Sequence, residues 1–150
     1  MKTTSKNKFI TATIMLFVFV GMLSMSFVNY TQDDKKKKPW IVPDKSKAVK
    51  NPVKSDDANL TNGKALYTKH CKSCHGTKGL GDGPKSKELE TPCGDISVDL
   101  KDQTDGEVFF KVKEGRDDMP SFKKKLPEDD DIWTIVNYVR TLAGDDAKKK

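Results

Sequence analysis

Apolar residues recur at helical spacing in three segments of the chain, at about 60–71, 104–114 and 127–143. The third segment has the clearest pattern, and its predicted buried face consists of Ile132, Trp133, Ile135, Val136, Val139 and Leu142. The three segments together predict an all-α domain that occupies residues 58–144.

Residues that favour helix ends flank each of these segments. Thr61 is the expected cap of the first helix, and Thr104 or Asp105 is that of the second. The second helix should end at Gly115, and the third should run from Pro127 in its first turn to a stop at Gly144. Between the first two helices, residues 76–84 contain too many glycines for a regular element, so we expect a loop there.

The first 28 residues have the pattern of an export signal. Three lysines near the start are followed by an apolar run from Ile14 to Leu23 and by Ser24-Met25-Ser26, a small-x-small cleavage site. The alternative is an uncleaved membrane anchor, because the twenty residues from Phe9 to Val28 are long enough to cross a bilayer. Either reading places the domain outside the cytoplasm, in the periplasm or on the outer face of the inner membrane.

Residues 29–57 are rich in lysine and proline and predict a flexible linker. Trp40-Ile41-Val42-Pro43 interrupts this polar run with an apolar patch. We interpret the patch as an N-terminal strap that lies against the domain, and the alternative is a docking peptide for a partner. The last residues, 145–150, are expected to be disordered.

The formal charge of +6 is carried outside the predicted domain. Eleven lysines and five aspartates give residues 1–57 a charge of +6, whereas fourteen basic and fifteen acidic residues give residues 58–144 a charge of −1, and the tail adds +1. A basic leader and linker do not make a nucleic-acid-binding face, and the chain contains no nucleic-acid motif. We therefore expect no nucleic-acid partner.

Cys71-Lys72-Ser73-Cys74-His75 has the Cys-x-x-Cys-His pattern of a c-type haem attachment site. The thiols of Cys71 and Cys74 would form thioethers with the haem vinyl groups, and His75 would coordinate the iron. A redox Cys-x-x-Cys would need a βαβ surround, and a zinc site would need a second ligand pair. Because only Cys93 and His70 remain elsewhere, the sequence favours one covalent haem c.

Met119 is the candidate for the second axial ligand of the iron. Haem in electron carriers is held by His on one face and by Met or His on the other, and the other four methionines lie in residues 1–28. Met119 precedes Pro120 on an irregular stretch between the second and third helices, where its thioether can turn toward the iron. The alternatives are that Met119 is an ordinary core residue, or that His70 is the second ligand, although His70 cannot easily reach the opposite face.

In their order along the chain, these features resemble the class I cytochrome c family of bacterial respiratory chains. The residues that carry the resemblance over 58–144 are Gly63, Tyr67, Cys71, Cys74, His75, Gly76, Asp105, Gly106, Glu107, Phe109, Gly115, Met119, Pro120, Ser121, Phe122, Ile132, Trp133, Val136, Tyr138, Val139 and Arg140. The resemblance implies a proximal His75, a distal Met119 and thioethers at Cys71 and Cys74. It also implies a close crossing of the first and last helices, with Gly63 against Trp133, Val136 and Tyr138.

Cys93 departs from the family pattern. The segment Thr91-Pro92-Cys93-Gly94-Asp95 lies where such domains often have a Pro-x-Asp turn without cysteine. We interpret Cys93 as a buried, unreactive thiol, and an intermolecular disulfide or a redox role remain the alternatives.

A haem with both axial positions filled exchanges electrons but does not bind substrate, so the sequence predicts an electron carrier and not an enzyme. Expected partners are an upstream quinol-oxidising complex and a downstream oxidase or reductase, and Lys123, Lys124 and Lys125 form either a docking patch or a solvated loop. The alternatives are a haem subunit fixed in a larger membrane oxidoreductase complex, and a haem enzyme or gas sensor if Met119 is displaced.

Overall fold

Three helices, α3 (Asp57–His70), α6 (Asp105–Glu114) and α7 (Asp129–Leu142), organise residues 39–143, the part of the chain that the computed structural model describes. The shorter elements are α2 (Asp44–Lys47), α4 (Lys72–His75), η1 (Ser86–Glu88) and α5 (Ile96–Asp99). Within this range there is no strand, and the predicted all-α fold is confirmed. The predicted leader, the start of the predicted linker, Gly144 and the tail lie outside the described residues.

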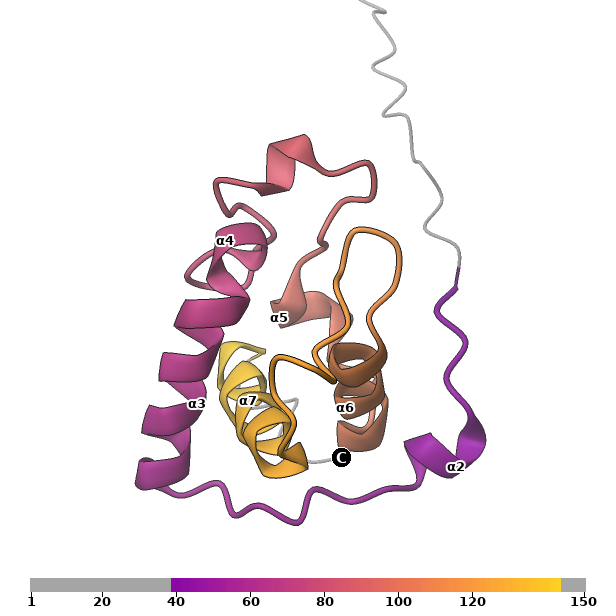
Figure 1. The fold of residues 1–150 in the computed structure, drawn as a ribbon, viewed down its shortest axis with the longest axis vertical. Coiled ribbons are helices and arrows are strands. Elements are labelled where there is room, and N and C mark those ends of the chain that lie inside the picture. The colour runs from indigo at the N-terminus through magenta and orange to yellow at the C-terminus, as the bar shows by residue number, and fades with distance from the viewer. Residues whose placement is uncertain (1–38, 144–150) are drawn as a thin grey trace, which may run out of the picture. The chain divides into compact units, whose positions relative to one another are not determined.

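Helix α7 is the centre of the domain and packs between α3 and α6 (Figure 1). Its predicted apolar face is confirmed, because five of its six residues are buried and Leu142 is partly buried. The Trp133 ring stacks on Phe109 of α6 with a centroid distance of 4.0 Å and an interplanar angle of 15°. Apolar burial along α7 therefore holds the other two long helices in place.

The crossing of α3 and α7 depends on the absence of a side chain at Gly63. A Cβ atom at this position would lie 2.4 Å from the carbonyl oxygen of Thr134 and 2.9 Å from Cβ of Tyr138. The rings of Tyr67 and Tyr138 then pack across the same crossing with their centroids 5.3 Å apart. The predicted contact with Tyr138 is confirmed, but the nearest backbone is that of Thr134 and not that of Trp133 or Val136.

The helix ends agree with the sequence prediction for α6 and differ for the other two helices. Thr104 and Glu107 form a reciprocal capping box at the start of α6, which ends at Gly115. Helix α3 begins earlier than predicted, because the Asp56 carboxylate accepts a hydrogen bond from the Asn59 amide and caps it in place of Thr61. Helix α7 begins at Asp129, so that Pro127 precedes the helix.

Residues 39–56 differ from the predicted flexible linker, because they pack along the domain. Asn51 donates to the carbonyl oxygen of Trp133 at 3.2 Å and to the side chain of Asn137 at 2.9 Å. Asn137 donates in turn to the carbonyl oxygen of Val53 at 3.0 Å. Val42 is only 4% exposed, as the strap interpretation of the Trp40 patch requires. These partners lie more than 80 residues away in sequence, which is why local composition does not reveal them.

No helix within residues 39–143 is both long and apolar enough to cross a membrane. The candidate anchor from Phe9 to Val28 lies outside the described residues.

Candidate haem site

The Cys-x-x-Cys-His motif forms a single turn at the end of α3. Cys71 is the C-cap that follows α3, and its carbonyl oxygen accepts a hydrogen bond from the amide of His75 at 3.0 Å. Cys74 and His75 lie on the following turn, α4. Cys71 and Cys74 are both thiols and are not joined by a disulfide. The local backbone therefore presents two thiols and one imidazole from five consecutive residues.

The two cysteines differ in their surroundings. Cys71 packs against the hydrophobic core, and this burial raises the pKa of its thiol to about 12, with a further contribution from the charge of Cys74. Cys74 is partly buried, and its sulfur lies 3.8 Å from the hydroxyl oxygen of Ser73. At neutral pH the Cys71 thiol is therefore protonated, and it lies at an apolar surface of the kind that suits a porphyrin edge.

Residues 76–84 form the expected glycine-rich loop, which folds back on α4. The amide of Gly81 donates to the carbonyl oxygen of His75 at 2.9 Å, and the amide of Gly83 donates to that of Cys74 at 3.1 Å. A Cβ atom at Gly83 would lie 2.5 Å from the carbonyl oxygen of Ser73, so only glycine allows this approach. The loop thus fixes the backbone that carries Cys74 and His75.

Tyr67 connects this loop to the helix crossing. Its hydroxyl group, buried in the core, donates to the carbonyl oxygen of Gly76 at 2.7 Å. Burial raises the pKa of Tyr67 well above its ordinary value, so the phenol remains protonated. The Nδ1 atom of the His75 ring is also buried. Tyr67, near the end of α3, therefore helps to hold the backbone that follows α4.

Met119 lies on a tight hairpin between α6 and α7, which we call the Met119 hairpin, residues 115–120. The amide of Arg116 donates to the carbonyl oxygen of Met119 at 2.8 Å, and the amide of Met119 donates to that of Arg116 at 2.9 Å. Asp117 has a φ of 52°, in the left-handed region that is unfavourable for residues other than glycine. A backbone in this conformation persists only where its surroundings hold it.

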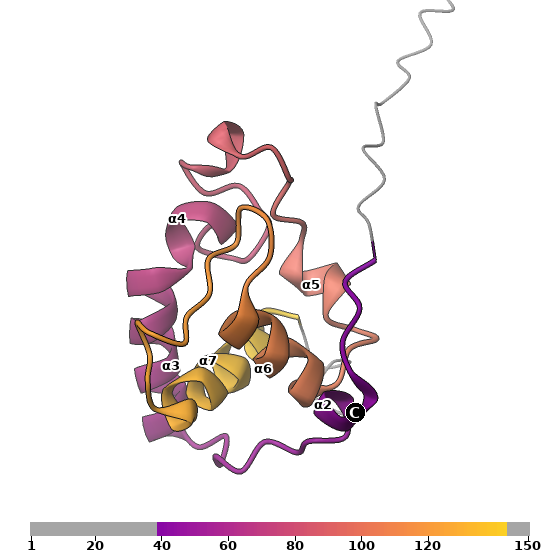
Figure 2. The same cartoon turned by 45° about the vertical axis from the view of Figure 1, so that its right-hand side comes forward.

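Two contacts bring the Met119 hairpin to the end of the domain that carries the motif. The ring of Phe122, three residues after Met119, packs edge-on against that of His70, which precedes Cys71, at a centroid distance of 6.0 Å. On the other side, the amide of Thr91 donates to the carboxylate of Asp118 at 2.8 Å. Figure 2 shows the loop between α6 and α7, in orange, extending toward α4.

The other two sequence candidates, His70 and Cys93, lie beside this site. His70 is partly buried against Phe122, and burial lowers the pKa of its imidazole. Cys93 is partly buried in a loop whose backbone lies against the glycine-rich loop, since a Cβ atom at Gly81 would lie 2.6 Å from the carbonyl oxygen of Gly94. The expectation that His70 is not the second ligand stays a prediction.

Sequence reasoning did not identify Arg116, Asp118 or Thr91 as residues that hold the site. Thr91 and Asp118 are 27 residues apart in sequence, so their hydrogen bond leaves no local pattern. Arg116 acts through its backbone pairing with Met119, which does not depend on the type of side chain. The local signal was weak, since Asp117-Asp118 is a less specific turn sequence than one with glycine.

The donor set at this end of the domain fits a covalently bound haem. Two thiols and an imidazole lie on one turn, and a thioether lies on the neighbouring hairpin; these are the groups that attach a c-type haem and ligate its iron. Cys71 and Met119 also pack against the same apolar core, which a porphyrin face would extend. Within residues 39–143 no group of three or more His, Cys, Asp or Glu side chains is arranged to hold a metal ion by itself.

This combination of fold and motif is that of a c-type cytochrome domain. The family model described as cytochrome c oxidase, cbb3-type, subunit III matches residues 58–139, more than half of the chain, and the chain belongs to this family. A domain of this family implies a covalently bound haem c and electron transfer.

A similar solved structure is the reducing HAO-like protein complex of Kuenenia stuttgartiensis. Its matching chain is 26% identical with a TM-score of 0.55, and the match covers 71% of this chain and 52% of that one. The present chain therefore spans about half of the length of its structural neighbour. Among curated proteins, none matches the chain.

Proposed function

We propose that this protein transfers single electrons through one haem c that is attached at Cys71 and Cys74 and ligated by His75 and Met119. The observation that carries the proposal is the fixed turn of Cys71, Cys74 and His75 at the end of the domain where His70 contacts Phe122, three residues after Met119. When bound, the haem supplies a couple between ferric and ferrous iron. The protein's own part is to fix two ligands and to exclude others.

Each ligand has a separate support in this proposal. The carbonyl oxygen of His75 is held by the amide of Gly81, and the backbone of Met119 is held by that of Arg116. An axial methionine and an apolar surround both favour the ferrous state and raise the reduction potential. We therefore expect a potential suited to the oxidising end of a respiratory chain.

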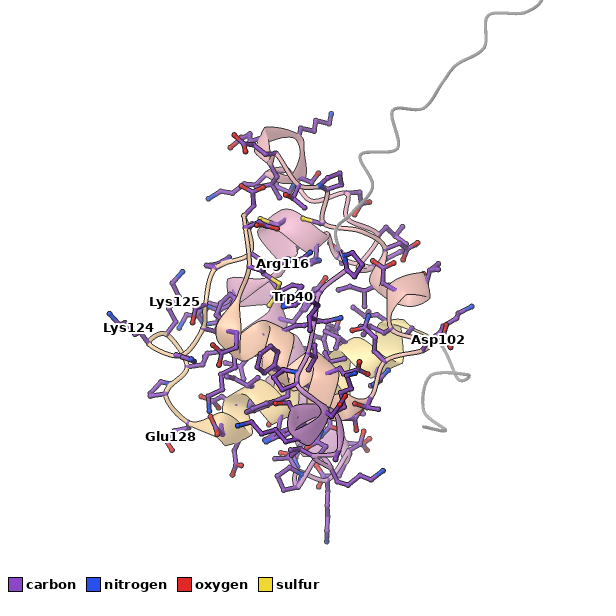
Figure 3. The ribbon with its side chains drawn as sticks, turned by 90° about the vertical axis from the view of Figure 1, so that its right-hand side faces the viewer. Trp40, Asp102, Arg116, Lys124, Lys125 and Glu128 are labelled. Carbon is purple, nitrogen blue, oxygen red and sulfur yellow. The ribbon has the colours of Figure 1, made fainter. Side chains whose placement is uncertain are left out.

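We place this activity outside the cytoplasm, in the periplasm or on the outer face of the inner membrane. Support comes from the export pattern of residues 1–28 and from the attachment of c-type haem after export. The proposed partners are an upstream quinol-oxidising complex and a downstream oxidase or reductase. Beside the Met119 hairpin, Lys124 and Lys125 are exposed (Figure 3), and Nζ of Lys125 lies 5.6 Å from the centroid of the Phe122 ring. Lys123 forms an ion pair with Glu114 at 2.6 Å.

A second candidate is a haem subunit that stays fixed in a larger membrane oxidoreductase complex. The specific support is that the family is described as an oxidase subunit and that the structural neighbour belongs to a multi-subunit complex. Purification from native membranes in mild detergent separates the two candidates. A free carrier elutes alone at physiological ionic strength, whereas a fixed subunit elutes with stoichiometric partners.

Carbon monoxide tests the closed coordination that distinguishes a carrier from an enzyme or gas sensor. The ferrous holoprotein is titrated with carbon monoxide and its visible spectrum is recorded, with Met119→Ala as the comparison. The proposal predicts no spectral change in the wild type at concentrations that convert Met119→Ala completely. Equal carbon monoxide affinity in the two proteins would mean an open site, and therefore catalysis or sensing.

A further inference from the structure

The N-terminal strap, residues 39–51, reaches the Met119 hairpin through an aromatic contact. The guanidinium carbon of Arg116 lies 4.5 Å from the centroid of the Trp40 ring, and Nζ of Lys111 lies 5.7 Å from the same centroid (Figure 3). Two cations thus lie against one partly buried indole, which is the aromatic ring that binds cations best. The contact joins the start of the strap to the segment that links α6 to α7.

The strap is anchored independently of Trp40. A Cβ atom at Gly106 would lie 2.0 Å from the carbonyl oxygen of Ser46, so the end of α2 rests directly on the first turn of α6. The Thr104 hydroxyl donates to the carbonyl oxygen of Lys47 at 2.8 Å, and Asn51 is bonded to α7. A segment fixed at several points beyond Trp40 can hold that indole in one place.

Arg116 passes this support to Met119 through the main chain. The two residues exchange both backbone hydrogen bonds, so a shift of Arg116 moves Met119. Gly115 leaves little space for adjustment, because a Cβ atom there would lie 2.4 Å from the amide nitrogen of Ser121. The far side of the hairpin is held by the bond between Thr91 and Asp118. Trp40 and Thr91 therefore support the hairpin from two different segments of the chain.

We infer that Trp40 is a positioning residue for the Met119 ligand, and that the strap controls how readily Met119 leaves the haem iron. This inference rests on the proposed function, since it requires Met119 to be an axial ligand. Its consequence is that a change in the N-terminal segment alters the strength of the bond between Met119 and the iron.

Competition by imidazole measures the strength of the bond between Met119 and ferric iron. Imidazole replaces the methionine, and the far-red ferric band of iron–methionine coordination disappears as it binds. In the ferric holoprotein, we expect Trp40→Ala to bind imidazole about fivefold more tightly than the wild type, the size of effect that a cation–π contact supports. Trp40→Phe, which keeps an aromatic face, should recover part of the difference.

Two controls separate positioning from general loss of stability. Ile41→Ala alters the neighbouring residue of the strap, whose side chain is 86% exposed, and should leave imidazole binding unchanged. Arg116→Gln also removes the ion pair of Arg116 with Asp117, so it should give at least the increase of Trp40→Ala, and adding Trp40→Ala to it should bring no further change. In hydrogen exchange, the Met119 amide should exchange faster in Trp40→Ala than in Ile41→Ala.

The outcomes distinguish this inference from the proposed function. If Trp40→Ala changes imidazole binding no more than Ile41→Ala does, while Met119→Ala abolishes the far-red band, the role of Trp40 is overturned and the proposed ligation stands. If Met119→Ala keeps the band, both the ligation and the role of Trp40 are overturned.

Discussion

At the scale of single residues, Arg140 shows how one side chain joins three parts of the domain. Its guanidinium donates to the carbonyl oxygens of Leu100 at 2.7 Å and Gln103 at 2.6 Å, and to the carboxylate of Asp105 at 2.8 Å. The arginine is 7% exposed. A planar group with several fixed donors suits this position, and lysine could not make all three contacts.

We expect Arg140→Leu to lower the free energy of unfolding of the holoprotein by about 3 kcal/mol, because it leaves a buried carbonyl oxygen, a partly buried one and a carboxylate without their donor. Urea denaturation followed by circular dichroism measures the change. Arg140→Lys should recover less than half of the loss. Lys101→Leu, at an exposed position near the same turn, should stay close to the wild type, and an equal loss there would contradict the account.

At the scale of the elements, the crossing of α3 and α7 sets the frame on which the motif is mounted. Gly63 allows the close approach, and one turn later Tyr67 spans from the crossing to the loop that follows His75. The motif therefore begins at the end of a helix whose position is fixed by backbone contact.

Gly63→Ala tests whether this close approach is necessary. In a free helix the substitution would stabilise by about 1 kcal/mol, because glycine is the poorer helix former. The added Cβ atom would lie 2.4 Å from a backbone oxygen, so α3 and α7 must move apart, and we expect a net destabilisation of about 2 kcal/mol. The measurement is the urea midpoint, with the exposed neighbour Asn62→Ala as control; a midpoint above that of the wild type would show that the helices do not approach as described.

The helices could be predicted from sequence where their signals are local. Thr104 and Gly115 flank an apolar stripe, and the structure has α6 between them. The start of α3 was less evident, because Asp56 and Thr61 are both good caps and only the fold selects between them. The Trp40 patch indicated a strap, but the order of residues 39–56 as a whole was not predictable from composition, since this lysine- and proline-rich segment is held by distant contacts such as that of Asn51 with α7.

The candidate site could be predicted in part for the same reason. Cys71, Cys74 and His75 form one contiguous pattern whose chemistry is independent of the fold, and Met119 was identified as the one methionine outside residues 1–28. The residues that hold Met119 were not visible, because Arg116 acts through its backbone and Asp118 acts on a loop 27 residues away in sequence. Patterns therefore indicated the candidate ligands, and the fold was needed to identify the residues that hold them.

At the scale of the whole molecule, the described chain has a small core and a haem-binding motif next to it. The buried apolar residues gather mainly on α7 and the segments that face it. A domain of about 100 residues buries a limited fraction of its surface, so a covalently held porphyrin would add substantially to the core. Stability and haem attachment should therefore be coupled.

Removal of the attachment site tests this coupling. We expect Cys71→Ser/Cys74→Ser, expressed with c-type haem maturation, to carry no covalent haem and to lose most of its cooperative unfolding transition. The third cysteine provides the matched control: Cys93→Ser should retain both haem and stability. The measurements are haem staining after denaturing electrophoresis and thermal circular dichroism. Covalent haem in the double variant would refute the assignment of the two attachment residues.

The far-red absorption of the ferric holoprotein tests the central claim most directly. The account predicts a covalent, low-spin haem with the band of iron–methionine coordination, lost in Met119→Ala and retained in Cys93→Ser. A band that survives in Met119→Ala, or a high-spin wild-type spectrum, would contradict the proposed ligation by His75 and Met119 and the electron-carrier function that rests on it.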